Sequence, residues 1–143
     1  MESRASTTWE GDLMSGSGTT SLASGATEPF AVTWSSRTEA SEGRTSPEEL
    51  IAAAHATCFS MAFSNGLAKA GTPPNRLDTA ATVTFEKSES GFKVPKSALT
   101  VRADIPGISE DEFQVAAAEA KEGCPVSQAL QGNVEITLEA SLV

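Results

Sequence analysis

The sequence predicts a single α+β domain, because stretches with strand character lie on both sides of one long helix that carries almost no charge. A chain of 143 residues is long enough for one domain with one hydrophobic core. No internal repeat and no low-complexity tail interrupts the chain, so we expect residues 1–143 to form one domain.

Residues 5–37 contain three segments rich in Thr, Ser, Val and Trp, a composition typical of strands. The turn-forming stretches SGSG and SGATEP separate these segments. We therefore expect three strands in a meander over 5–37. The polar, glycine-containing residues 40–46 that follow are typical of a loop.

The long helix is predicted to begin after Ser46. Pro47 would occupy the first helical position, and Glu48 and Glu49 would lie in the first turn, where the helix dipole favours acids. Glu49 has the spacing that closes a capping box on Ser46. These features predict that residues 47–70 form one continuous helix.

The end of this helix is also marked in the sequence. Gly71 and the Pro73-Pro74 pair follow the last helix-forming residues, and neither residue type continues a helix well. Residues 51–67 carry so little charge that the helix cannot have an ordinary wet face. We therefore expect it to be surrounded by protein on most sides.

Two longer strands are predicted at 76–89 and 92–105, where β-branched residues recur. The Ser90-Gly91 pair between them favours a hairpin turn. Near the end of the chain, residues 133–142 alternate apolar and polar side chains, so we expect a strand that completes the sheet.

Residues 108–123 predict a second, shorter amphipathic helix, with Ser109 as its N-cap and Gly123 as its stop. Cys124 follows directly and precedes a proline. Residues 125–130 can therefore begin another short helix with Cys124 at or next to its N-cap.

The charge balance excludes some partners. The chain has a formal net charge of -9 at pH 7, which disfavours nucleic acid and anionic membrane surfaces. No apolar run reaches the roughly 18 to 20 residues that span a bilayer. The first residues lack the basic stretch and apolar segment of a signal peptide, so we expect a cytoplasmic protein.

The chain has only two cysteines, Cys58 and Cys124, so neither a disulfide framework nor a four-thiolate zinc site can be built from it alone. His55 is its single histidine. Because catalytic zinc or iron usually takes two or three imidazoles, the sequence argues against a metalloenzyme, although carboxylates could supply oxygen ligands.

Cys58 lies in the middle of the long predicted helix, far from either end of the helix dipole. A thiol reacts as its thiolate, and burial among apolar side chains would raise the pKa of Cys58. It would need a nearby cation, for which arginine is best suited, to act as a nucleophile. Without one, Cys58 would be a small buried core residue.

Cys124 has a different setting, because the free N–H groups at the start of the 125–130 helix can stabilise its thiolate. The alternative is that Cys124 is only a helix-start residue that fits its position.

His55 precedes Cys58 by three residues and would lie on the same helical face, and Cys–His pairs activate nucleophiles in some hydrolases. The alternative is that a lone histidine in an apolar helix is a hydrogen-bonded core group. A hydrolase would lose its activity on His55→Ala, whereas the alternative predicts that the chemistry tolerates this change.

At this point the string TSPEELIAAAHATCFSMAFS and the later string GCPVSQAL resemble the osmotically inducible protein C (OsmC) family of peroxidases. The resemblance runs from WEGD at 9–12, through PGIS at 106–109, to the terminal strand. The two cysteine motifs, with Val126 and Gln128, are more similar to this branch than to the sister family of organic hydroperoxide resistance proteins.

The resemblance implies antiparallel sheets wrapped around a long central helix, in an intertwined homodimer with its active sites at the subunit interface. It implies that Cys58 is the peroxidatic cysteine and Cys124 the resolving cysteine. It also implies that Arg37, in the loop before the helix, stabilises the thiolate and the leaving oxygen, and that Glu48 orients Arg37. Because the loop also contains Arg44 and the helix start also contains Glu49, these two residues remain alternatives.

By the same resemblance the protein reduces organic hydroperoxides in oxidative or osmotic stress defence, without metal, haem or flavin. The disulfide between the two cysteines would be reduced by an external dithiol such as the lipoyl group of a protein. Phe59, Met61 and Phe63 could favour a substrate with a hydrocarbon tail, or could simply pack in the core. A non-catalytic thiol sensor or binding domain is the alternative from another functional class.

Overall fold

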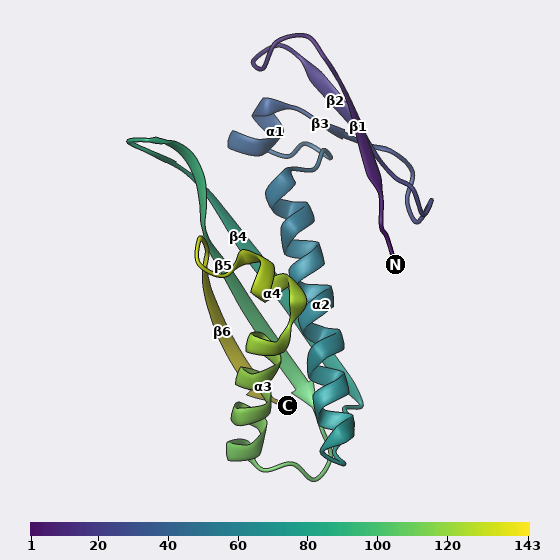
Figure 1. Ribbon diagram of the computed structural model, residues 1–143, viewed down its shortest axis with the longest axis vertical. Helices are drawn as coiled ribbons and strands as arrows, with labels where there is room; N and C mark the ends of the chain where they lie inside the picture. Colours follow the sequence, from purple (N-terminus) through teal and green to yellow (C-terminus); the bar gives the residue numbers. More distant parts are fainter. The chain divides into compact units, whose positions relative to one another are not determined.

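The computed structural model describes all 143 residues. It divides into two compact units, an N-terminal unit, Met1–Leu50, and a C-terminal unit, Ile51–Val143. Figure 1 shows the order of the elements, with α2 beginning in the N-terminal unit and continuing into the C-terminal unit. The α+β fold class, with small sheets and one long helix, is confirmed. That residues 1–143 act as one domain stays a prediction.

The N-terminal unit contains the predicted meander. Strands β1 (Ala5–Glu10), β2 (Ser17–Leu22) and β3 (Phe30–Val32) pair antiparallel in that order. The third strand is shorter than expected, because helix α1 (Trp34–Thr38) follows it. The hydroxyl of Thr33 accepts from the N–H of Ser36 at 3.1 Å, and the hydroxyl of Ser36 accepts from the N–H of Thr33 at 3.0 Å.

This reciprocal cap starts a helix where the sequence had indicated strand, and it corrects the prediction after Val32. Arg37 consequently lies on the short helix α1 and not in the loop in which it was expected.

Helix α2 (Pro47–Lys69) begins and ends where the sequence predicts. The hydroxyl of Ser46 accepts from the N–H of Glu49 at 3.1 Å, which confirms the N-cap. The carboxylate of Glu49 accepts from the hydroxyl of Thr45 at 2.6 Å, so this glutamate is engaged at the helix start. Gly71 has φ 87°, a left-handed conformation that glycine adopts without strain, and it turns the chain out of the helix.

The sheet of the C-terminal unit has the order β4 (Arg76–Ser88), β5 (Gly91–Asp104), β6 (Glu135–Leu142). Strands β4 and β5 form the predicted antiparallel hairpin, and β6 completes the sheet. Strand β6 runs parallel to β5, because helices α3 and α4 carry the chain back before β6 begins. The family resemblance implied antiparallel sheets, and the pairing of β5 with β6 differs from that expectation.

Helix α3 (Glu110–Gly123) has the predicted capping box, formed by Ser109 and Glu112. Gly123 is its last residue and not the cause of its end. Cys124 ends the helix, with an extended backbone at φ -68° and ψ 121°, as a following proline favours. Cys124 is also the N-cap of α4 (Pro125–Leu130), as the sequence predicted.

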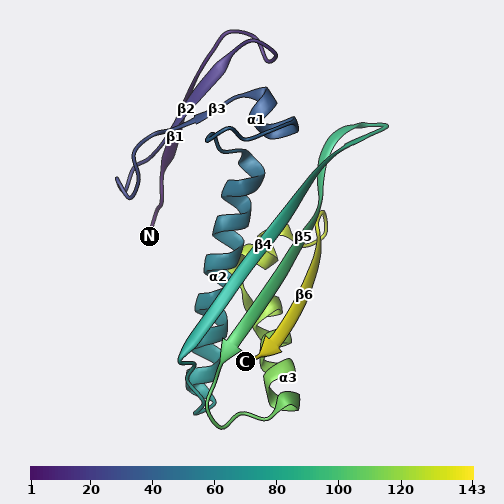
Figure 2. The same ribbon diagram turned by 180° about the vertical axis from the view of Figure 1, so that it is seen from behind.

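Helices α2, α3 and α4 cover one face of the sheet, as the two opposite views in Figures 1 and 2 show. The core lies between these helices and the sheet, and the rings of Phe63 on α2 and Phe113 on α3 are 5.8 Å apart. Phe59 and Phe63 are fully buried, so they pack in this core. Met61, on the same helix, is 70% exposed.

Within one chain, α2 is covered on only one of its faces. The side chains that are buried there are His55, Phe59, Phe63 and Leu67, whereas Ala53, Ala54 and Met61 are exposed. The expectation that protein surrounds the helix on most sides is therefore not met by a single chain. By length and hydropathy alone α2 could also cross a membrane, but the core helix of a soluble protein meets the same criterion.

Candidate functional site

The two cysteines of the chain come together in the C-terminal unit. Cys58 is half-buried on α2, and Cys124 is fully buried at the N-cap of α4. Both are free thiols. Their side chains form a hydrogen bond with each other, so the fold places the sulfurs of these two distant residues side by side.

The first turn of α4 supplies hydrogen-bond donors to both sulfurs. The N–H of Ser127 donates to Sγ of Cys124 at 3.5 Å. The N–H of Val126 acts on both thiols and favours the ionised form of each. The expectation that free N–H groups at the start of this helix would serve Cys124 is confirmed, and the same turn also reaches Cys58.

The ionisation of the two thiols is coupled. Burial raises the pKa of Cys58, and its hydrogen bond and charge interaction with Cys124 act in the same direction. Burial also opposes ionisation of Cys124. The pKa of Cys124 is nevertheless lowered, because hydrogen bonds from Cys58, Ser127 and the N–H of Val126 together outweigh that burial. Within the C-terminal unit, the surroundings therefore oppose ionisation of Cys58 and favour ionisation of Cys124.

An arginine–glutamate pair lies in the N-terminal unit. Nε of Arg37 donates to both carboxylate oxygens of Glu48, at 3.2 and 3.1 Å, and Nη2 donates to Oε1 at 2.7 Å. Glu48 is only 6% exposed, so the pair is needed to compensate its buried charge. The Arg37 guanidinium also lies 5.9 Å from the centre of the Trp34 ring. The expected bidentate contact between Arg37 and Glu48 is therefore present.

The alternative residues are engaged elsewhere. Arg44 pairs at 3.3 Å with the exposed Glu42. Glu49 accepts from Thr45. Of the four residues considered, only Arg37 and Glu48 form a partly buried, multiply hydrogen-bonded pair. Their catalytic roles stay predictions.

His55 is a hydrogen-bonded core group. Its Nδ1 lies 2.7 Å from the hydroxyl of Ser97 on β5, and its Nε2 lies 2.9 Å from the hydroxyl of Ser127 on α4. Burial lowers the pKa of His55, which favours the neutral ring. Because both ring nitrogens are hydrogen-bonded to serines, neither is available to accept a proton from Cys58. The geometry therefore argues against the Cys58/His55 hydrolase.

Sequence reasoning missed Ser97, Ser127 and the N–H of Val126 as neighbours of the site. One signal was available, since a buried histidine requires two hydrogen-bond partners. The sequence could not show which of its many serines supply them, because Ser97 and Ser127 are 42 and 72 residues from His55 along the chain.

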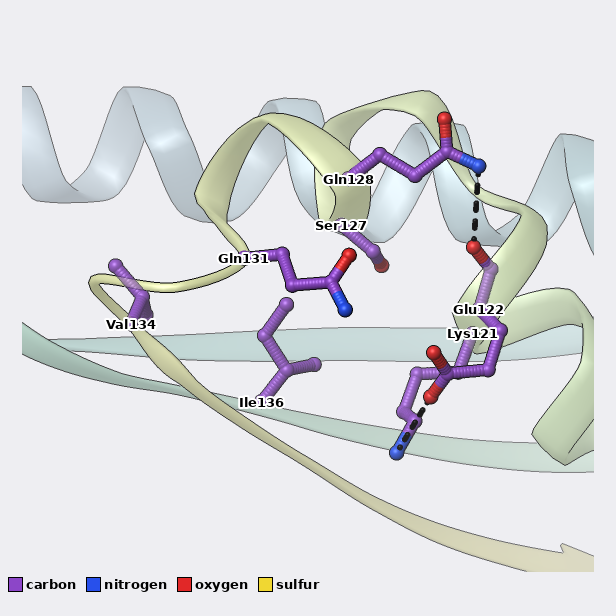
Figure 3. A pocket seen from close by; sticks show the side chains of 7 residues that line it. All are labelled: Lys121, Glu122, Ser127, Gln128, Gln131, Val134 and Ile136. Atoms are coloured by element: carbon purple, nitrogen blue, oxygen red, sulfur yellow. Dashed lines mark hydrogen bonds and ion pairs between the residues drawn. The ribbon is translucent and has the colours of Figure 1, made fainter.

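Two cavities are relevant to these residues. A small one of about 180 Å³ lies between α3, α4 and β6 and is lined by Ser127, Gln131 and Ile136, among others (Figure 3). A mostly apolar groove of about 470 Å³ lies within the N-terminal unit, where Trp9, Trp34 and Arg37 contribute to its wall. No group of three or more His, Cys, Asp or Glu side chains is placed to hold a metal ion.

The chain is similar in sequence to known proteins over most of its length. Residues 40–139 match the model of the family described as OsmC-like protein. The peroxiredoxin OsmC of Escherichia coli is 46% identical over 94% of this chain and 92% of its own. An organic hydroperoxide resistance protein-like protein of Staphylococcus aureus is 34% identical over 69% of this chain and 71% of its own.

Solved structures share the fold. The organic hydroperoxide resistance protein OhrB of Bacillus subtilis has a TM-score of 0.76 and 27% identity, covering 96% of this chain and 97% of its own. An organic hydroperoxide resistance protein from Legionella pneumophila also has a TM-score of 0.76, with 26% identity over 98% of this chain and 97% of its own.

Proposed function

The chain belongs to the OsmC-like protein family, and from this premise we propose that it is a thiol peroxidase that reduces organic hydroperoxides in stress defence. The observation that carries the proposal is the direct contact between the two free thiols, Cys58 on α2 and Cys124 at the start of α4. The names of its relatives, peroxiredoxin and organic hydroperoxide resistance protein, support the same chemistry.

The cycle begins with attack of the Cys58 thiolate on the distal peroxide oxygen. The O–O bond breaks, the alcohol leaves, and Cys58 becomes a sulfenic acid. The sulfur of Cys124 then attacks the sulfenic sulfur and water leaves, which produces the disulfide between Cys58 and Cys124. An external dithiol, of which a protein-bound lipoyl group is one form, returns both residues to thiols. This cycle needs no metal, haem or flavin.

The assignment requires a cation that acts on Cys58, because the groups of the C-terminal unit alone raise its pKa. Arg37 is suited to this role, since its guanidinium is held in place by Glu48 and presents several N–H donors in a planar group. It would stabilise the thiolate of Cys58 and then the alkoxide as the O–O bond breaks. Glu48 acts as a positioning residue for Arg37.

We place the site in an intertwined homodimer. Two surfaces support this: the exposed apolar side of α2 and the apolar groove of the N-terminal unit. Contiguous exposed apolar surface on a small protein is typical of interaction sites. A second copy of the chain, which carries the same surfaces, could cover both. We also place the protein in the cytoplasm, which subcellular fractionation can check.

The test is stopped-flow oxidation of the reduced protein by cumene hydroperoxide and by hydrogen peroxide, with mass spectrometry of the products and Cys58→Ser as the control. We expect fast oxidation that depends on Cys58 and favours the organic peroxide. Slow oxidation without preference would mean that the thiols sense redox state without turnover, which is the alternative from another functional class.

A further inference from the structure

We propose that His55 is a positioning residue for the resolving step, because it ties the helix of Cys58 to the first turn of the helix that Cys124 begins. This inference rests on the roles proposed above for the two cysteines. It assigns to His55 no contact with substrate and no transfer of a proton to or from sulfur.

The connection consists of three buried side chains. His55 on α2 is bonded to Ser97 on β5 and to Ser127 on α4, at 2.7 and 2.9 Å. His55 and Ser97 have no exposed surface, and Ser127 is 4% exposed. The histidine therefore joins three elements that carry or surround the thiols, in a region from which water is excluded.

Ser127 links this connection to the sulfur chemistry. Its hydroxyl contacts His55, while its own backbone N–H donates to Sγ of Cys124 at 3.5 Å. The preceding N–H, of Val126, acts on both thiols. A shift of this turn away from α2 would therefore weaken the hydrogen bonds that its N–H groups donate to both sulfurs. It would also separate Cys124 from Cys58.

Disulfide formation is the step most sensitive to such a shift. The peroxide reaches Cys58 from solution, so the first step needs no alignment of Cys124 with Cys58, and Cys124 acts on it only through the pKa of Cys58. In the second step the sulfur of Cys124 must approach the sulfenic sulfur of Cys58 along the S–O axis, with loss of water. A misplacement of about 1 Å can slow a reaction that depends on alignment about a hundredfold.

A competing reaction makes this step measurable. The sulfenic acid of Cys58 either forms the disulfide or reacts with a second hydroperoxide, which loses one oxygen to give the alcohol and leaves Cys58 as a sulfinic acid. The peroxide concentration at which half of Cys58 becomes sulfinic acid therefore reports the rate of disulfide formation relative to overoxidation.

The test compares three serine variants in the full-length protein, oxidised with increasing cumene hydroperoxide and analysed by mass spectrometry. Ser127→Ala removes the hydroxyl that contacts His55 and keeps the backbone N–H that donates to Sγ of Cys124. Ser127→Thr keeps the hydroxyl at a position that borders the small cavity (Figure 3). Ser60→Ala is the matched control, because Ser60 joins α2 to Thr79 of the sheet at 2.8 Å without reaching α4.

We call the peroxide concentration at which half of Cys58 becomes sulfinic acid the half-point. We expect Ser127→Ala to lower the half-point by roughly ten- to a hundredfold. The rate of the first, peroxide-dependent phase should stay within about twofold of the wild type. Ser127→Thr and Ser60→Ala should keep the wild-type half-point. The inference is overturned if Ser127→Ala leaves the half-point unchanged, or if Ser60→Ala lowers it as much.

A His55→Asn variant tests the same connection from the other side, and it should shift the half-point in the same direction as Ser127→Ala. An unchanged half-point in folded His55→Asn protein would also overturn the inference.

Failure of the cysteine roles themselves would look different. In that case Cys124→Ser would not accumulate sulfenic acid, or Cys58→Ser would still consume peroxide, whatever the serine variants do. These two variants are measured beside the others, so that the two failures are distinguished.

Discussion

The two units of the molecule differ in how they bury their side chains. All eleven buried hydrophobic residues lie in the C-terminal unit, where three helices cover one face of the sheet. In the N-terminal unit the buried residues are Gly18, Thr20, Ser36 and Glu48, and every residue of β1 is exposed. The C-terminal unit thus has a hydrophobic core of its own, whereas the N-terminal unit has an ion pair and an open apolar groove.

The two units therefore contribute differently to stability and to the chemistry. The C-terminal unit supplies the free energy of folding and holds the two thiols in contact. The N-terminal unit supplies the charged pair of Arg37 and Glu48, and its apolar groove is open. Substitutions in the C-terminal unit should therefore change stability most, and substitutions in the N-terminal unit should change reaction rate and association.

The largest effect is expected from Phe63→Ala in the core of the C-terminal unit. Phe63 is fully buried against Phe59 and Phe113. Its truncation should lower the free energy of unfolding by about 3–5 kcal/mol, measured by urea denaturation. Val115→Ala on the exposed side of α3 is the control and should cost little, since Val115 is 58% exposed. Equal losses in both variants would contradict the location of the core.

The next effect is expected from Arg37→Ala in the N-terminal unit. If Arg37 stabilises the thiolate and the leaving oxygen, the peroxide step should slow by about 10²–10³-fold in stopped-flow measurements. Arg44→Ala, which removes only an exposed ion pair, should react within about twofold of the wild type. A normal rate for Arg37→Ala would refute its proposed role, and slow reaction of Arg44→Ala would mean that the wrong arginine was chosen.

A smaller effect is expected from Trp9→Ala, which alters the groove of the N-terminal unit. Trp9 is 40% exposed and lines this groove, so in a homodimer it should contact the second copy. Its loss should weaken self-association by about 2 kcal/mol, roughly thirtyfold in Kd, measured by sedimentation equilibrium. Met14→Ala is the control, because Met14 is 75% exposed and lies outside the groove. A monomeric wild-type protein would refute the dimer.

The smallest effect concerns the pH dependence of stability. Burial lowers the pKa of His55 below its ordinary value of 6.5, so the unfolded chain binds this proton more readily than the folded protein. The contribution of the neutral ring to the free energy of unfolding is fully present above pH 6.5, and this contribution decreases as the pH falls below 6.5. His55→Asn should remove this decrease, which urea denaturation at pH 5 to 8 can measure. Parallel pH profiles for the two proteins would show that His55 does not contribute it.

Local sequence determined those elements whose ends depend on neighbouring residues. The start of α2 at Ser46, its end at Gly71 and the capping box at Ser109 were all predicted, because each depends on hydrogen bonds or backbone angles within a few residues. The family could also be identified, since its two cysteine motifs are contiguous strings. The exception was α1, where a short cap at Thr33 outweighed the strand propensity of its neighbours.

Tertiary structure decided what depends on residues far apart in the chain. It determined that β6 is parallel to β5, that Glu48 pairs with Arg37 and not with Arg44, and that the pKa of Cys58 is raised while that of Cys124 is lowered. It also gave His55 its two serine partners. Each of these outcomes is a choice among chemically equivalent partners, such as several serines or two arginines. Composition and spacing do not distinguish such partners, whereas packing brings one of them within hydrogen-bond distance and excludes water from the contact.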